Sequence, residues 1–144
     1  MQALQLRERV GCSETDRKAW DRAGVLVALR PAGGTGVHAQ YDDANLIAAL
    51  IALEMKYMGV TASRYAAAFA ELHTWLRARS SLDWPRSRVF LTPSQARFQR
   101  AGDPTPSDLA GFTLDLGPLC ARVSAEPRPQ PSQASLKLPL GAVR

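Results

Sequence analysis

The sequence predicts a mainly helical protein with a small amount of β structure. Residues 4–10 and 13–26 have the pattern of two short helices separated by a Gly–Cys break. Residues 44–58 and 61–79 have the pattern of two longer apolar helices, and short β-type runs lie between and after these segments. A chain of 144 residues with 46% hydrophobic residues can bury a core, which excludes a wholly disordered protein.

Basic residues are concentrated towards the two ends of the chain. The formal net charge of +5 divides into +2 for residues 1–40, −1 for residues 41–83 and +4 for residues 84–144. An excess of Lys and Arg is compatible with a polyanionic partner such as nucleic acid. The middle of the chain is therefore predicted to be core, flanked by basic segments.

The sequence has no feature of a membrane or secreted protein. No apolar run approaches the roughly 20 residues that span a bilayer, and the first ten residues carry charge where a secretory signal needs an apolar core. Cys12 and Cys120 lie far apart, and neither has a second Cys or a His at a metal-ligand spacing. We expect a cytoplasmic protein with reduced cysteines, no metal and no membrane contact.

Residues 13–26 form the most informative stretch. Ser13 with Asp16 three residues later is typical of a helix start, and Gly24 is typical of a helix end. Trp20 lies on the apolar side, so we expect it to anchor the helix in the core, with Thr15, Arg17 and Lys18 facing outward. Taken alone, this pattern fits any surface helix.

The neighbouring helix gives the stretch a possible function. Two short helices joined by a tight turn at Gly11 have the pattern of a helix-turn-helix. In that motif the second helix enters the major groove of DNA, and its N-terminal residues lead. Arg17 or Lys18 would then read a guanine or hold a phosphate, and the sequence does not separate these roles.

A hairpin is predicted after the second helix. Two β-type runs, residues 25–29 and 37–41, flank the Gly-rich residues 30–36. This loop does not end in Lys-Ser/Thr and opens no helix, so we reject a phosphate-binding nucleotide loop. Directly after a helix-turn-helix, the hairpin is most simply a wing that touches DNA through Arg30, Thr35, His38 and Gln40.

The two longer helices are expected to supply the core. Asp42 and Asp43 supply the cap and first-turn charge of the helix at 44–58, and an apolar seam follows the helix at 61–79. The seam consists of Tyr65, Phe69, Leu72 and Leu76. A stacking surface for a ligand is the alternative for its two aromatic residues, but packing is the commoner role of such a stripe.

Residues 4–79 together resemble the DNA-binding module of the MerR family of bacterial transcription regulators. The resemblance rests on the order and spacing of six short motifs, which cover just over half of the chain. These are Gly11-Cys12-Ser13, residues 15–20, Gly24-Val25-Leu26, Gly33-Gly34, residues 40–46 and Met58-Gly59-Val60.

The resemblance implies a winged helix-turn-helix that binds double-stranded DNA as a homodimer, with Tyr41 among the contacts. The sequence departs from the family pattern in three residues: Trp20 replaces the usual Tyr, Thr15 lies one place early, and Gln40 replaces the usual Arg. The family's long dimerisation helix is also absent, since Trp84-Pro85 prevents the helix at 61–79 from continuing.

The remaining residues are predicted to form a small module and a tail. Residues 88–91 and 112–116 read as strands, residues 93–100 as a turn or short helix, and Gly117-Pro118 as a chain break. We therefore expect a DNA-binding domain at 1–81, a dimerisation or partner-binding α+β module at 82–123, and a Pro-rich, flexible tail at 124–144. Residues 136–140 either dock on a partner as an extended strand or trail in solvent.

The functional prediction is a sequence-specific, homodimeric DNA-binding transcription regulator. An antitoxin or adaptor, which binds a protein partner through its C-terminal region and autoregulates its operon, is the alternative. No catalytic constellation is visible, because neither histidine has a Cys, Asp or Glu at a convincing spacing, and no cofactor is expected. The predicted DNA-binding residues are Ser13, Thr15, Arg17, Lys18, Arg22, Arg30, Thr35, His38, Gln40 and Tyr41.

Overall fold

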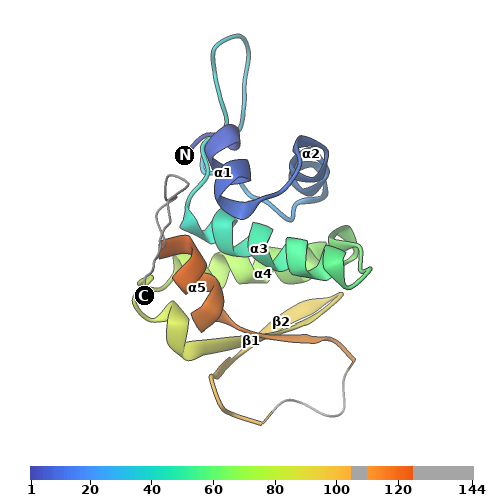
Figure 1. The fold of residues 1–144 in the computed structure, drawn as a ribbon, viewed down its shortest axis with the longest axis vertical. Helices are drawn as coiled ribbons and strands as arrows, with labels where there is room; N and C mark the ends of the chain where they lie inside the picture. Colours follow the sequence, from blue (N-terminus) through green and yellow to red (C-terminus); the bar gives the residue numbers. More distant parts are fainter. Residues whose placement is uncertain (105–109, 125–144) are drawn as a thin grey trace, which may run out of the picture.

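The protein has a mixed α/β fold, described by a computed structural model for residues 1–104 and 110–124. Within these residues, five α-helices accompany a three-stranded antiparallel sheet (Figure 1). The α-helices are α1 (Ala3–Val10), α2 (Glu14–Ala23), α3 (Asp43–Tyr57), α4 (Ala66–Arg77) and α5 (Leu116–Ser124). The strands are β1 (Ser87–Thr92), β2 (Gln95–Arg100) and β3 (Phe112–Asp115), and two 3-10 helices are η1 (Ala62–Tyr65) and η2 (Trp84–Arg86).

The first two helices begin and end where the sequence predicts. Gly11 closes α1 with a φ of 84°, and Gly24 closes α2 with a φ of 82°, a region that only glycine enters without strain. Ser13 caps α2, since its Oγ accepts a hydrogen bond from the Asp16 N–H at 3.0 Å. The predicted helix, glycine turn and helix are therefore confirmed.

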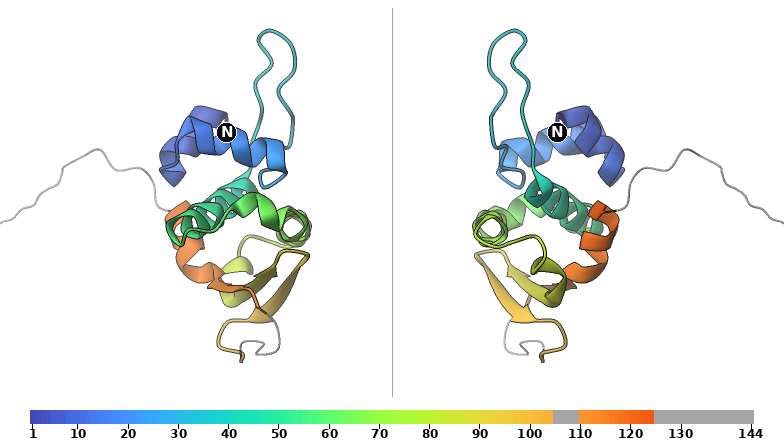
Figure 2. Two further views of the ribbon diagram at one scale, coloured as in Figure 1. Left: turned by 90° about the vertical axis from the view of Figure 1, so that its right-hand side faces the viewer. Right: turned by 90° about the vertical axis from the view of Figure 1, so that its left-hand side faces the viewer.

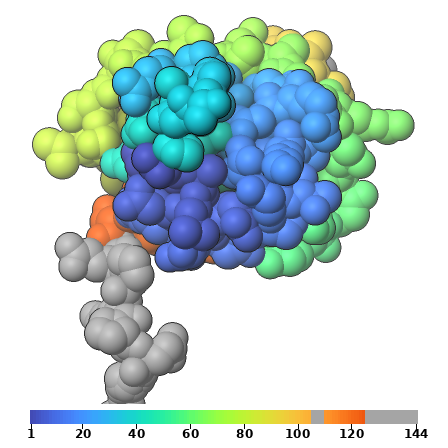
Figure 3. Space-filling model, turned by 90° about the horizontal axis from the view of Figure 1, so that it is seen from above, coloured from blue at the N-terminus to red at the C-terminus, as the bar shows by residue number. Residues whose placement is uncertain are grey.

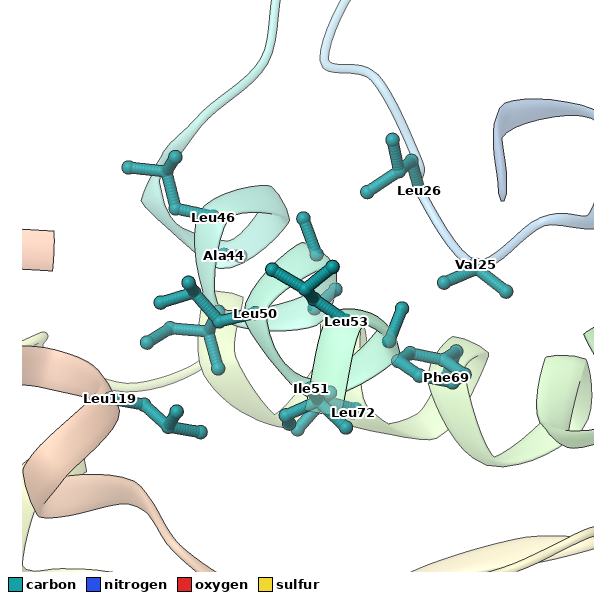
Figure 4. Close-up of a cluster of buried hydrophobic side chains, with 14 of the residues drawn as sticks. Val25, Leu26, Ala44, Leu46, Leu50, Ile51, Leu53, Phe69, Leu72 and Leu119 are labelled. Atoms are coloured by element: carbon teal, nitrogen blue, oxygen red, sulfur yellow. The ribbon is translucent and has the colours of Figure 1, made fainter. Parts of the chain in front are cut away.

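Helix α3 runs through the middle of the molecule. Asp42 caps it by accepting from the Asn45 N–H at 3.1 Å, as predicted, and most of its side chains are buried. The helix expected at 61–79 instead starts as the 3-10 turn η1 and is regular only within α4. Phe69 and Leu72 of α4 are fully buried against α3, so the seam is core packing here (Figure 4).

The segment between α2 and α3 differs from the predicted hairpin of two regular strands. In the described structure its two arms pair with each other at two isolated antiparallel bridges, Arg30 with Gln40 and Gly33 with Val37. Val25 and Leu26 leave the hairpin and fill the core at 0% and 3% exposure (Figure 4). The rest of the loop projects from the body (Figure 1), and the side chains of residues 29–38 are exposed. Pro31 also has no N–H to donate to a strand partner.

The C-terminal half contains two elements that the sequence analysis assigned incorrectly. Residues 93–100 are not a turn or short helix, because β2 pairs along its whole length with β1, from Ser87 with Arg100 to Thr92 with Gln95. Most side chains of β2 are polar on both faces, so its sequence lacks the apolar–polar alternation that predicts a strand. Gly117 and Pro118 do not break the chain either; they lie in the first turn of α5, where a missing proline N–H costs no helical hydrogen bond.

One hydrophobic cluster joins both halves of the described chain. It includes Leu6 of α1, most of α3, and Val89, Leu91 and Leu116 from the sheet and α5. The sheet, in the order β2-β1-β3, lies on the far side of α4 from α1 and α2 (Figure 2). Within residues 1–104 and 110–124, no helix has the length and apolarity to cross a membrane.

Candidate nucleic-acid interface

One side of the molecule is formed by α1, α2 and the projecting loop of residues 27–40. Figure 3 looks down on this side and shows the three segments as one continuous surface. Thr15, Lys18 and Arg22 are exposed along α2, at the spacing of one helix face. Trp20 is 6% exposed and anchors the opposite face, which confirms its predicted role in the core.

Arg17 was expected to face outward, but in the structure its side chain turns inward. Its Nε donates to Glu14 Oε1 at 2.5 Å, and its Nη1 donates to the Asp21 carboxylate and, at 3.0 Å, to the Tyr41 hydroxyl. The Arg17 side chain is 12% exposed. Acidic residues three places before and four places after it, together with a hydroxyl from a distant segment, draw the guanidinium inward.

Tyr41 is also an interior residue in this structure. Its side chain is 2% exposed, and its hydroxyl donates to Asp21 Oδ2 at 2.5 Å. Burial and the neighbouring Asp21 carboxylate raise the pKa of Tyr41 to about 12, so the hydroxyl keeps its proton. Tyr41 and Arg17 therefore join α2 to the end of the loop and leave the surface to other residues.

The remaining predicted residues divide into backbone supports and exposed side chains. Ser13 caps α2, and Gln40 pairs through its backbone, because its N–H donates to the Arg30 carbonyl at 2.8 Å. Arg30, Thr35 and His38 are exposed on the loop. The exposed basic side chains of the predicted set are thus Lys18, Arg22 and Arg30, with His38 beside them on the loop.

The base of the loop is held by a polar network that sequence reasoning missed. Asn45 of α3 is fully buried; its Oδ1 accepts from the Val27 N–H at 2.8 Å and its Nδ2 donates to the Val27 carbonyl at 3.0 Å. Arg77 of α4 donates to the same carbonyl at 2.5 Å and to Asp42 Oδ2 at 2.9 Å. Burial raises the pKa of Asp42, but the hydrogen bonds from Arg77 and Asn45 prevail and leave it below its usual value.

A second buried contact fixes the chain just before the loop. His73 of α4 is 3% exposed, and its Nε2 lies 2.9 Å from the Val25 carbonyl, which can only accept. Burial lowers the pKa of His73, opposed by the hydrogen bond to Val25. In the sequence, Asn45 and His73 are polar residues within otherwise apolar helical patterns. Such a position indicates a buried hydrogen bond, but it does not identify the partner.

The start of α2 is tied to the end of α3. Lys56 Nζ lies 2.6 Å from Asp16 Oδ2. The hydrogen bond from Lys56 lowers the pKa of Asp16, although burial of that carboxylate acts in the opposite direction. This exposed ion pair adds to the packing of Trp20 in setting the direction of α2.

The surface formed by α1, α2 and the loop presents the exposed basic side chains of Lys18, Arg22 and Arg30. Among the described residues, no three His, Cys, Asp or Glu side chains gather where they could hold a metal ion.

No protein-family model matches this sequence, and a comparison of the sequence with curated proteins finds no match.

Proposed function

We propose that this protein is a transcription regulator that binds double-stranded DNA sequence-specifically as a homodimer, through a winged helix-turn-helix. The observation that carries the proposal is the shared surface of Figure 3: the exposed face of α2 and the projecting loop lie side by side. The resemblance of residues 4–79 to the MerR family supports the same function.

In this proposal α2 enters the major groove and the loop acts as a wing. Thr15, Lys18 and Arg22 face the groove, because they form the exposed stripe of α2. Arg30 and His38 contact the backbone or the minor groove beside it. Phosphate neutralisation supplies much of the affinity, and the two copies set the spacing of the half-sites.

Arg17 and Tyr41 have a different part in this proposal from the one the sequence suggested. Their hydrogen bonds to Asp21 fix the end of the loop against α2. They act as positioning residues, which orient the two DNA-contacting segments relative to each other. The contact with bases is left to the side chains that remain exposed.

The test is selection of binding sites from a pool of random DNA duplexes, followed by gel-shift titration of the selected duplex. We expect a two-fold symmetric consensus with half-sites about one helical turn apart. Lys18→Gln and Arg22→Gln should each weaken binding by about 1–3 kcal/mol if the lost contact is to a base. If the lost contact is to a phosphate, the slope of log K against log salt concentration should become shallower by about 1.

Arg97→Gln is the matched control, because it removes one exposed positive charge on β2, on the far side of α4. It should leave the affinity nearly unchanged. A pool without any enriched sequence, or equal losses for all three variants, would contradict the proposed recognition surface. An enriched but asymmetric consensus would contradict the homodimer.

A further inference from the structure

A cluster of aromatic and basic side chains lies between α4 and β2. Strand β2 lies on the far side of α4 from α1 and α2 (Figure 2). The rings of Trp75 and Phe98 are stacked, with centroids 4.4 Å apart and planes 2° from parallel. The guanidinium carbon of Arg79 lies over the Trp75 ring, 4.5 Å from its centroid. Stacking and the cation–π contact hold these three side chains in fixed positions.

The cluster is assembled from three separate segments of the chain. Ala96, Phe98 and Arg100 alternate along β2 and so share the face of the strand that meets α4. Glu71 of α4 binds the strand, because its Oε1 accepts from the Ala96 N–H at 2.7 Å. The η2 turn brings Arg86 to the same place.

Two open hollows lie beside this aromatic pair, which lines both of them. The first has a volume of about 450 Å³ and brings together three arginines with a single acidic residue. Its basic residues are Arg79, Arg86 and Arg100, and its acid is Asp83. The second, of about 420 Å³, is mainly apolar, with Ala70, Ala78 and Ala96 on its walls.

The three arginines around the first hollow outnumber its one acidic residue, Asp83. Within the part of the chain that the structure describes, Arg79, Arg86 and Arg100 form no salt bridge, whereas Arg17, Arg77 and Arg88 each contact a carboxylate. An excess of positive charge around one hollow favours the binding of an anion there.

We propose that this cluster is a binding site for a small organic anion that carries an aromatic or apolar group. The anionic group contacts Arg86 and Arg100, and the apolar group lies against Trp75 and Phe98 towards the second hollow. The volumes are those of small-molecule sites, and a charged group beside an apolar wall is their usual composition. Arginine suits phosphate and carboxylate because its fork donates two hydrogen bonds at once.

This site does not depend on DNA binding, because it shares no residue with the surface formed by α1, α2 and the loop. A single-stranded nucleic acid is the macromolecule that the same side chains would attract. Binding of a strand needs a groove that follows several nucleotides, whereas each of these two hollows has the volume of a small-molecule site. We therefore favour the small anion, and the test separates the two.

The test is a titration of the full-length protein with 1-naphthyl phosphate, followed by NMR at the Trp75 indole N–H. Trp75→Phe identifies this resonance among the three tryptophans. We expect a saturable shift. Arg86→Gln and Arg100→Gln should each weaken the apparent affinity by about tenfold, the effect of losing one charge-assisted contact.

Two matched comparisons make the result specific. Arg97→Gln removes a positive charge next to Phe98 on β2, on the face of the strand opposite to Phe98 and Arg100. This variant should leave the affinity for 1-naphthyl phosphate unchanged. 1-Naphthalenemethanol, which has the ring without the charge, should bind much more weakly than 1-naphthyl phosphate.

Several results would overturn the proposal. One is the absence of a saturable shift with 1-naphthyl phosphate in the millimolar range, and another is equal affinity of the wild type, Arg86→Gln and Arg100→Gln. Tight, arginine-dependent binding of an oligothymidine that 1-naphthyl phosphate fails to displace would assign the cluster to single-stranded nucleic acid instead.

Discussion

Arg17 and Lys18 are adjacent basic residues whose surroundings give them different roles. Arg17 lies between Glu14 and Asp21, at the spacings that bring side chains together on a helix, and its guanidinium is drawn inward. Lys18 has the same two acids four places before and three places after it, but among the described contacts they bind Arg17 instead, and Lys18 stays exposed. The Glu14–Arg17–Asp21 spacing was readable in the sequence, but the Tyr41 hydroxyl that completes the group was not.

At the residue scale, we predict that His73 makes stability depend on pH. Its Nε2 donates to the Val25 carbonyl, so Nδ1 carries the lone pair, and Nδ1 is buried with no hydrogen-bond partner among residues 1–104 and 110–124. Protonation would place an unpaired charge in the core, which is why burial lowers the pKa of His73 below its ordinary 6.5. The unfolded chain takes up this proton first, so the contribution of His73 is fully present above pH 6.5 and is lost as pH falls below it towards the folded pKa.

Thermal unfolding at several pH values between 7 and 5 measures this effect. The wild-type Tm should fall in this window by about 4 °C for each kcal/mol lost, and His73→Gln should flatten the decrease because an amide takes up no proton here. His38→Gln, at an exposed position on the loop, is the control and should retain the wild-type slope. An unchanged slope in His73→Gln would show that another group causes the pH dependence.

At the scale of elements, the loop of residues 27–40 depends on its anchorage to α3 and α4. Within the described part of the chain, two isolated bridges are its own backbone pairing, and its base is held where Asn45 and Arg77 bind the backbone of Val27. Glycines at 33, 34 and 36 and the lack of buried side chains explain why no regular ladder forms.

We predict that Asn45→Leu destabilises the protein by about 1–3 kcal/mol, because it removes the hydrogen bonds that the buried Asn45 side chain makes to Val27 and Asp42. Urea denaturation measures the loss, and hydrogen exchange should show faster exchange of the Val27 amide than in the wild type. Asp43→Asn, at an exposed position in the first turn of α3, is the control for both measurements. Unaltered exchange at Val27 would mean that Asn45 does not hold the loop.

At the scale of the whole molecule, the two halves share one core. Trp84 of η2 donates through its indole Nε1 to the Leu76 carbonyl of α4 at 3.1 Å, and Leu116 and Leu119 of α5 belong to the same cluster as Leu6 of α1. Arg9 of α1 also donates to the Val123 carbonyl of α5. These contacts favour one cooperative unit over residues 1–104 and 110–124.

We predict that Leu116→Ala costs about 2–5 kcal/mol, as expected for a fully buried leucine. The same variant should lower the urea midpoint reported by Trp20 fluorescence in a chain whose other two tryptophans are Phe, because Trp20 in α2 belongs to the same core. Leu82→Ala is the control, since Leu82 is 80% exposed. If Trp20 unfolds at an unchanged midpoint in Leu116→Ala, the N-terminal helices form an independent unit.

The sequence by itself determined the elements whose signals are local. Caps, glycine stops and helical periodicity depend on residues within a few positions of one another, and they placed α1, α2 and α3 and the burial of Trp20 correctly. Strand β1 was also placed well, because its apolar run is short and bounded. Strand β2 was missed, since its identity depends on pairing with β1 and not on its own polar composition.

Only the tertiary structure decided which side chains remain free to bind. Tyr41 and Arg17 had the same polar character in the sequence as Lys18 and Arg22, but contacts across 20 or more positions buried the first pair. The Trp75–Phe98 stack and the arginines around it come from three segments that have no common pattern in the chain. Such sites depend on long-range packing, whose partners local physical rules do not specify.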